Sequence, residues 1–214
     1  MVLAAPPLIA SHLLPPVIRR FRERYPGVAV VLRDLLADEI LTRVSSGEVD
    51  FGIGTFHRLD DTLESQTLAT DSLILVAPPG HALARKRKLR WKDLAKEPLI
   101  ALDSHSSLRH LVDRTLDSAG CEGLTAYEVS FITTAIGMVE SGLGVAVLPS
   151  YILLSTRHSR VETRPIGEPV VEREVSIVTR AGKSLSPAAA DFAAFAKRHV
   201  RESLASERSS SRSR

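Results

Sequence analysis

The chain has 214 residues, 44% of them hydrophobic and 25% charged, with a net charge of +3, a composition that predicts a soluble globular protein long enough for two small lobes. The single cysteine, Cys121, excludes an internal disulfide bond and a cysteine-based zinc cluster, and it is typical of a reducing compartment. No apolar run reaches the roughly 18 residues of a transmembrane helix, and residues 1–5 lack the basic start of a signal peptide.

Strands and helices alternate through the first quarter of the chain. Residues 2–5 are an apolar run typical of a strand, and apolar residues at helical spacing predict a helix over residues 13–25. A second strand is predicted at residues 28–32, a second helix at residues 39–46 and a third strand at residues 49–54. A glycine follows each helix, as is common where helices stop. The predicted order is therefore strand, helix, strand, helix, strand.

The same order recurs from residue 99. Strands are predicted at residues 99–102, 125–129 and 145–148, and helices at residues 108–119 and 134–141. The last strand is an unbroken apolar run, which is typical of a strand buried on both faces of a parallel sheet. Two complete copies in tandem predict an α/β fold made of two βαβαβ half-units.

The connecting segments give weaker patterns. Residues 63–69 and 73–77 are predicted to be extended, residues 161–166 and 174–179 alternate like strands, and Ser186–Pro187 begins a last helix.

A short basic run between the two copies extends from Arg85 to Arg90. Such a run can serve nucleic acid, but without a scaffold motif a solvated loop is favoured. The arginines of the first helix are likewise assigned to a solvated face.

The candidate ligand-binding residues follow the predicted strands. Ligands of an open α/β sheet sit beyond the carboxyl ends of its strands, and two half-units place two such edges opposite each other with a cleft between them. Residues 104–107 precede a helix, so their hydroxyls cap it, hold an anion together with its free N–H groups, or do both. Ser130 and Thr133 admit the same roles, with capping favoured. Thr55 is either a ligand hydroxyl or a turn residue at a strand end, and the ligand role is favoured. The predicted site residues are Pro6, Leu8, Thr55, Phe56, Ser104, His105, Ser106, Ser130, Phe131 and Thr133.

Sequence patterns for catalysis and metal binding are absent. The seven histidines show no metal-ligand spacing such as H-x-H or H-E-x-x-H, and there is no G-x-S-x-G, Walker or G-x-G-x-x-G motif. His105 lies beside Ser104 and Ser106, but sequence neighbours rarely form a catalytic triad. Cys121 is assigned as an unreactive thiol. We therefore expect no enzymatic activity, no metal and no cofactor.

Several segments together carry a resemblance to a known family. They are LLPPVI at residues 13–18, FRERYPGV at 21–28, GEVDFGI at 47–53, LVAPPGH at 75–81 and VESGLGVAVLP at 139–149. In this order they resemble the effector-binding domain of the LysR-type bacterial transcriptional regulators, over residues 2–200. The resemblance implies two Rossmann-like lobes, as in type-II periplasmic binding proteins, with a small-molecule effector in the cleft between them.

The resemblance also implies domains and partners. We expect residues 1–72 plus 182–202 to form lobe I, residues 73–181 to form lobe II, and residues 203–214 to be a disordered Ser/Arg tail. Such regulators read DNA through an N-terminal winged helix-turn-helix, which is not in this chain; because the chain opens almost inside its first strand, we expect it to be a fragment. A cytoplasmic homodimer, tetrameric at full length, is implied as well.

One departure from the family pattern lies just after the first strand. Members commonly carry serine or threonine there to bind an acidic group of the effector, and the matching positions are Pro6 and Leu8. Proline has no N–H and no hydroxyl, so this edge offers fewer donors, and Leu8 would form an apolar wall. We therefore predict that polar recognition depends mainly on lobe II. The residues involved are Ser104, Ser106, Ser130 and Thr133, with Thr55 contributing from lobe I.

The favoured function is effector sensing, in which an organic acid or aromatic metabolite biases an attached DNA-binding domain. One alternative is a transport-type solute-binding protein of the same fold, which would show a signal peptide upstream. Another is an enzyme such as a ring-forming dehydratase, which needs acid–base groups facing the cleft; only His105 and Asp103 qualify.

Overall fold

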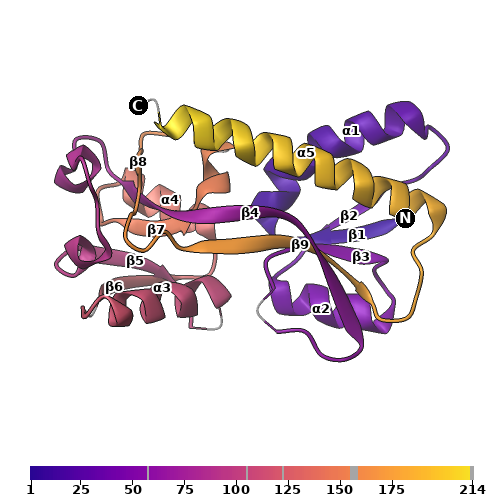
Figure 1. The fold of residues 1–214 in the computed structure, drawn as a ribbon, viewed down its shortest axis with the longest axis horizontal. Coiled ribbons are helices and arrows are strands. Elements are labelled where there is room, and N and C mark those ends of the chain that lie inside the picture. The colour runs from indigo at the N-terminus through magenta and orange to yellow at the C-terminus, as the bar shows by residue number, and fades with distance from the viewer. Residues whose placement is uncertain (57, 105, 122, 155–158, 213–214) are drawn as a thin grey trace. The chain divides into compact units, whose positions relative to one another are not determined.

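The computed structural model describes residues 1–212 except 57, 105, 122 and 155–158 (Figure 1). The chain divides into two compact units. Unit 1 contains Met1–Asp71 and Arg173–Glu207, and unit 2 contains Ser72–Glu172 and the last residues of the chain. The sequence analysis predicts that lobe I ends at residue 72, one residue later than unit 1, and that it resumes at residue 182, whereas unit 1 resumes at Arg173.

Unit 1 is the first predicted βαβαβ half-unit with later strands added. Its strands β1 (Val2–Ala5), β2 (Val31–Asp34) and β3 (Phe51–Gly54) alternate with α1 (Leu14–Arg24) and α2 (Ala37–Ser46). Both β2 and β3 pair with β1 in parallel, which gives the order β2-β1-β3. The later strand β9 (Glu172–Arg180) is antiparallel to β3 and lies between it and β4 (Leu63–Ala77) in the sheet order.

Helices cover both faces of this sheet: α2 lies on one face, and α1 and the start of α5 (Pro187–Arg212) lie on the other (Figure 1). The alternation of side chains along β3 explains this arrangement. Phe51 points to the α5 face, where its ring centroid lies 5.8 Å from that of Phe192. Gly52 points to α2, where a β-carbon would lie 2.3 Å from Ile40 Cγ2. The small residue therefore allows α2 to pack closely on the sheet.

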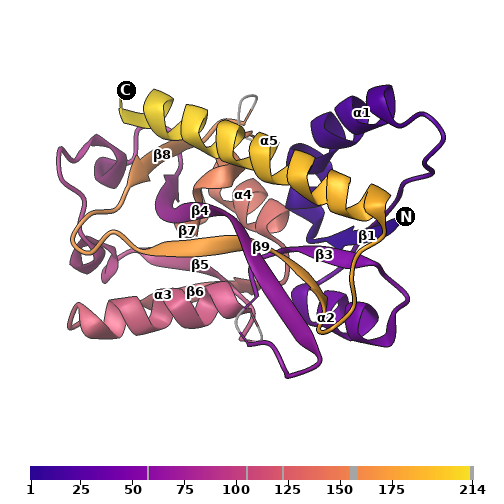
Figure 2. The same cartoon turned by 45° about the vertical axis from the view of Figure 1, so that its right-hand side comes forward.

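Unit 2 repeats the topology of unit 1. Its strands β5 (Pro98–Leu102), β6 (Leu124–Val129) and β7 (Ala146–Pro149) alternate with α3 (Ser107–Ser118) and α4 (Ile132–Glu140). Strand β6 pairs in parallel with β5, and Leu99 of β5 forms a parallel bridge with Val145 on its other side. Figure 2 shows α3 lying along β5 and β6. Through that bridge the order β6-β5-β7 matches β2-β1-β3. Ala146–Pro149 is buried throughout, as predicted for a strand covered on both faces, but it pairs antiparallel with β4.

Strands β4 and β9 are longer than the sequence predicts, whereas β8 (Glu162–Pro165) is shorter than its predicted range of 161–166. Segments 63–69 and 73–77 form one strand, β4, whose last part pairs antiparallel with β7 and with β8. Polar residues 70–72 interrupt the apolar pattern without interrupting the strand. The last helix, α5, continues to Arg212, so the structure differs from the prediction of a disordered tail from residue 203. A helix already begun on apolar contacts extends easily, because adding a residue is much less costly than nucleation.

Among the described residues, no helix combines the length and the apolar character needed to span a membrane.

Replacing Gly144 by alanine is expected to lower the free energy of unfolding by about 2–3 kcal/mol. A β-carbon there would lie 2.2 Å from the carbonyl oxygen of Pro98, which already accepts a hydrogen bond from Val145 N at 3.0 Å. The backbone at Pro98 cannot move away from the new β-carbon without breaking the hydrogen bond from Val145 N, which joins β5 to the residue before β7. Urea denaturation measures the loss.

The matched control for this substitution is Gly137→Ala in α4. A β-carbon at Gly137 meets nothing within 4 Å, and alanine is the better helix former by about 1 kcal/mol, so stability should rise. Equal effects of the two substitutions would show that the close approach at Gly144 is not what requires glycine.

Candidate effector-binding site

The carboxyl ends of β1 and β3 bring the predicted residues of unit 1 together. A β-carbon at Gly54, the last residue of β3, would lie 3.1 Å from Phe56 Cζ and 3.3 Å from Pro6 Cδ. Pro6 and Phe56 therefore adjoin across that glycine. Leu8 is 4% exposed and belongs to the helical turn that follows Pro6, so it packs into the unit more than it lines an open wall.

Thr55 is the polar group at this edge. Its hydroxyl oxygen is buried and has no hydrogen-bond partner among the described residues. An unpaired buried hydroxyl costs roughly 1–3 kcal/mol, so native structures rarely keep one without a reason.

The predicted residues of unit 2 also gather at one edge. Leu102 of β5 pairs with Val129 of β6, and the N–H of Asp103 donates to the Val129 carbonyl at 3.0 Å. The segments 103–106 and 130–133 therefore leave the sheet as neighbours and lead into α3 and α4. Ser104, Ser130, Phe131 and Thr133 are exposed, and Ser106 is half-buried. His105 lies outside the described residues.

The helix starts at this edge lack side-chain caps. Ser106 occupies the N-cap position of α3, and Phe131 that of α4, but neither side chain accepts a bond from its helix. The capping role left open for Ser106 is therefore not realised. The N–H groups in the first turn of each helix have no partner within the helix, and the N-terminal end of each helix carries a partial positive charge. Together with the nearby hydroxyls, these groups form a set of donors suited to an anion.

Arg109 is a residue of this edge that no sequence motif marks. Its Nη1 donates to the Leu102 carbonyl at 3.1 Å and to Glu128 at 3.1 Å, while its Nε donates to Asp113 at 2.6 Å. Arg109 thereby ties α3 to the ends of β5 and β6. The Arg109–Asp113 spacing of four residues on a predicted helix was the available signal.

The described residues were predicted to bind no metal ion. No cluster of three or more His, Cys, Asp or Glu suited to a metal ion occurs among them. Burial, followed by the charge of Asp117, raises the pKa of the Cys121 thiol, which donates to the Leu116 carbonyl at 3.4 Å. A raised pKa keeps the thiol protonated and unreactive.

The two βαβαβ units, each with polar groups at the carboxyl edge of its sheet, define a ligand-binding domain of the periplasmic-binding-protein class. A family model described as the LysR substrate binding domain matches residues 1–201. The chain belongs to this family of regulators.

Relatives with curated descriptions are regulators as well. The uncharacterized HTH-type transcriptional regulator YbhD of Escherichia coli (strain K12) is 30% identical over 195 residues, which are 91% of this chain and 62% of the relative. The transcriptional dual regulator GltC of Bacillus subtilis (strain 168) is 28% identical over 191 residues, 89% of this chain and 64% of the relative. The chain thus spans about three fifths of the length of such relatives.

Solved structures share the fold. HinK, a LysR family transcriptional regulator from Pseudomonas aeruginosa, matches with a TM-score of 0.85 at 24% identity, covering 94% of this chain and 71% of that one. The effector binding domain of QuiR in complex with shikimate matches with a TM-score of 0.82 at 21% identity, covering 92% and 95%. The BenM effector binding domain with its effector benzoate gives 0.81 at 18% identity, covering 92% and 90%. The family match and the curated relatives, not these structures, favour a regulatory domain over a transport-type protein.

Proposed function

We propose that this chain senses an organic acid or a small aromatic metabolite and transmits its binding to a DNA-binding domain in the full-length regulator. The effector contacts the carboxyl edges of the sheets of both lobes, lobe I being residues 1–72 plus 182–202 and lobe II residues 73–181. Its binding shifts the conformational equilibrium of the domain and so biases the attached winged helix-turn-helix.

The observation that carries this proposal is the buried hydroxyl of Thr55, which has no hydrogen-bond partner among the described residues. An acceptor on the effector supplies the hydrogen bond that the Thr55 hydroxyl lacks. Phe56 and Pro6, which adjoin across Gly54, give this end of the site an apolar surface for a ring.

Lobe II supplies the anion-binding part. The uncapped starts of α3 and α4 offer N–H donors, supported by the hydroxyls of Ser104, Ser106, Ser130 and Thr133. Shikimate and benzoate, which bind the QuiR and BenM domains, are organic acids with a six-membered ring, and they define the class to test first.

Replacing Thr55 by valine is expected to weaken effector binding about tenfold while leaving the ligand-free protein equally or more stable. Valine keeps the shape and removes a hydroxyl that has no partner in the described protein. A thermal-shift screen of shikimate, benzoate and related acids identifies a binder by mass action, and calorimetry then gives its dissociation constant.

Thr42→Val is the matched control, because the Thr42 hydroxyl is exposed and donates only to the Asp38 carbonyl of its own helix. It should leave binding unchanged. Ser104→Ala and Thr133→Val test lobe II in the same assay. A confirmed effector whose affinity survives all three site substitutions would contradict this assignment.

The homodimer is supported by the two sheet edges that remain open in the sheet order. Strand β2 ends one sheet and β6 ends the other. Each carries exposed apolar residues: Val31 on β2, and Leu124 and Tyr127 on β6. Open edges of this kind invite pairing with another chain.

The remaining assignments follow from the regulatory role. The relatives are described as HTH-type regulators and are longer than this chain, which supports a helix-turn-helix outside it and a cytoplasmic location where DNA is accessible. The sensing domain itself performs no chemistry.

A further inference from the structure

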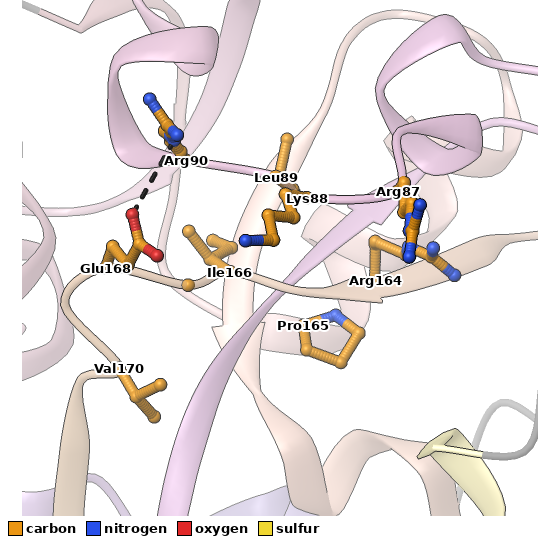
Figure 3. Close-up of a pocket in the computed structure, with 10 residues that line it drawn as sticks. Arg87, Lys88, Leu89, Arg90, Arg164, Pro165, Ile166, Glu168 and Val170 are labelled. Carbon is orange, nitrogen blue, oxygen red and sulfur yellow. Dashed lines mark ion pairs between the residues drawn. The ribbon is translucent and has the colours of Figure 1, made fainter.

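Unit 2 contains a pocket of about 520 Å³ that the proposed effector site does not use (Figure 3). It lies between residues 87–90, which are the end of the basic run, and residues 164–170, which comprise the end of β8 and the segment after it. Figure 3 shows Lys88 and Ile166 between the pair Arg90 and Glu168 on one side and Arg87 and Arg164 on the other.

Hydrogen bonds hold the two segments that line this pocket together. Gly167 N donates to the Leu89 carbonyl at 2.9 Å, and Arg164 Nε donates to the Lys86 carbonyl at 3.0 Å, so two hydrogen bonds join the two segments. Leu89 and Ile166 are each 2% exposed and anchor the segments in the core. The basic run, which the sequence favours as a solvated loop, is therefore one wall of a preformed cavity.

The pocket lining has a strong excess of positive charge. Four cationic side chains and one carboxylate line it: Arg87, Lys88, Arg90, Arg164 and Glu168. The three uncompensated charges equal the net charge of the whole chain. Cations gathered in a concave surface concentrate the field and attract anions more strongly than the same charges dispersed.

Nearby carboxylates do not neutralise this excess. Glu168 is 70% exposed and only 3.7 Å from Arg90 Nε, which makes a weak surface pair. The Asp93 carboxylate accepts hydrogen bonds from Lys86 Nζ at 2.8 Å and from Arg90 N at 2.9 Å. The bond from Lys86 lowers the pKa of Asp93. The side chains of Arg87 and Lys88 form no hydrogen bond or ion pair with any described residue.

We propose that this basic pocket binds a small organic polyanion, a phosphate ester or a di- or tricarboxylate, as a second ligand of the regulator. Its volume suits a metabolite. Pro165 and Val170, which are exposed, offer apolar contact to a carbon skeleton, while the guanidinium groups suit carboxylate and phosphate oxygens. No aromatic side chain lines the pocket to stack a base, which disfavours single-stranded nucleic acid as its occupant.

The fluorescence of the single tryptophan can report ligand binding in this pocket. Trp91, the single tryptophan, follows Arg90, and its Nε1 donates to the carbonyl of Pro169 at 2.9 Å, beside Glu168. Citrate and inorganic pyrophosphate, each titrated at constant ionic strength, should change Trp91 fluorescence along a saturating curve, whereas sodium chloride should not. Tighter binding of citrate would indicate a carboxylate ligand, and tighter binding of pyrophosphate would indicate a phosphate ligand.

The double substitution Arg87→Gln with Lys88→Gln should weaken the stronger probe at least tenfold without lowering the melting temperature of the free protein. Arg19→Gln with Arg22→Gln removes two exposed charges from α1 and should leave binding unchanged. Thr55→Val should also leave it unchanged, which separates this pocket from the effector site.

Three results would overturn the proposal. The first is no saturable response to either probe up to about 10 mM, and the second is equal weakening by the substitutions in α1. The third is a response to duplex DNA alone that depends on Arg87 and Lys88, which would make this surface a nucleic-acid contact.

Discussion

Phe192→Ala is expected to lower the free energy of unfolding by about 3–5 kcal/mol, the range for truncating a buried phenylalanine. Phe192 is fully buried where α5 meets α1 and β3. Its ring centroid lies 5.2 Å from that of Phe21 in an edge-to-face arrangement and 5.8 Å from that of Phe51. Alanine would leave a cavity between two other fully buried rings, which cannot collapse without moving a helix. Urea denaturation followed by circular dichroism gives the change.

Phe195→Ala is the control within the same helix. Phe195 is half-buried and lies 6.0 Å from Phe21, so its truncation should cost less than half as much. If the two substitutions destabilise the protein equally, then α5 stabilises unit 1 through its presence alone and not through the Phe192 contact.

The tandem architecture was predictable because its signals are local. Each glycine that ends a helix and each apolar run that follows it lies within a few neighbouring residues, and this holds for both copies. The buried strand Ala146–Pro149 and the order β2-β1-β3 follow from such patterns and from the rules for parallel crossovers. Family membership was predictable for the same reason, since the segment 139–149 combines these features.

Contacts between distant parts of the chain were not predictable from local pattern. Strand β4 continues through polar residues 70–72 because β9 and β7 hydrogen-bond to it, and no local pattern records those partners. The basic run forms a pocket wall only because Gly167 and Arg164 reach it from about 80 residues away.

The candidate site divides in the same way. Strand ends identified Thr55, Ser106 and Thr133 as polar positions, because a ligand edge follows from the sheet alone. Whether each hydroxyl already forms a hydrogen bond within the protein was not predictable from the sequence. Ser106 precedes α3 as a capping serine does, yet its hydroxyl makes no cap, and Thr55 is buried without a partner among the described residues.

Asp71→Ala is expected to lower the free energy of unfolding by about 3–5 kcal/mol, because it leaves a buried cation without its counter-charge. Asp71 on β4 is fully buried, and its Oδ2 lies 3.5 Å from Nε of Arg173 on β9, whose side chain is 9% exposed. Both residues make further interactions, so the loss is not confined to one pair. They also mark the places where the chain leaves unit 1 and returns to it.

The double substitution Asp71→Leu with Arg173→Met tests whether the charge pair itself is responsible. Apolar side chains of similar size remove both desolvation penalties, so the double variant should be more stable than Asp71→Ala and lie within about 2 kcal/mol of the natural protein. Glu48→Ala, which breaks the exposed pair with Arg43, should cost less than 1 kcal/mol. A loss at Asp71 as small as that at Glu48 would mean that the further interactions of Arg173, or water that reaches it, offset the loss of the Asp71 carboxylate, and would contradict this prediction.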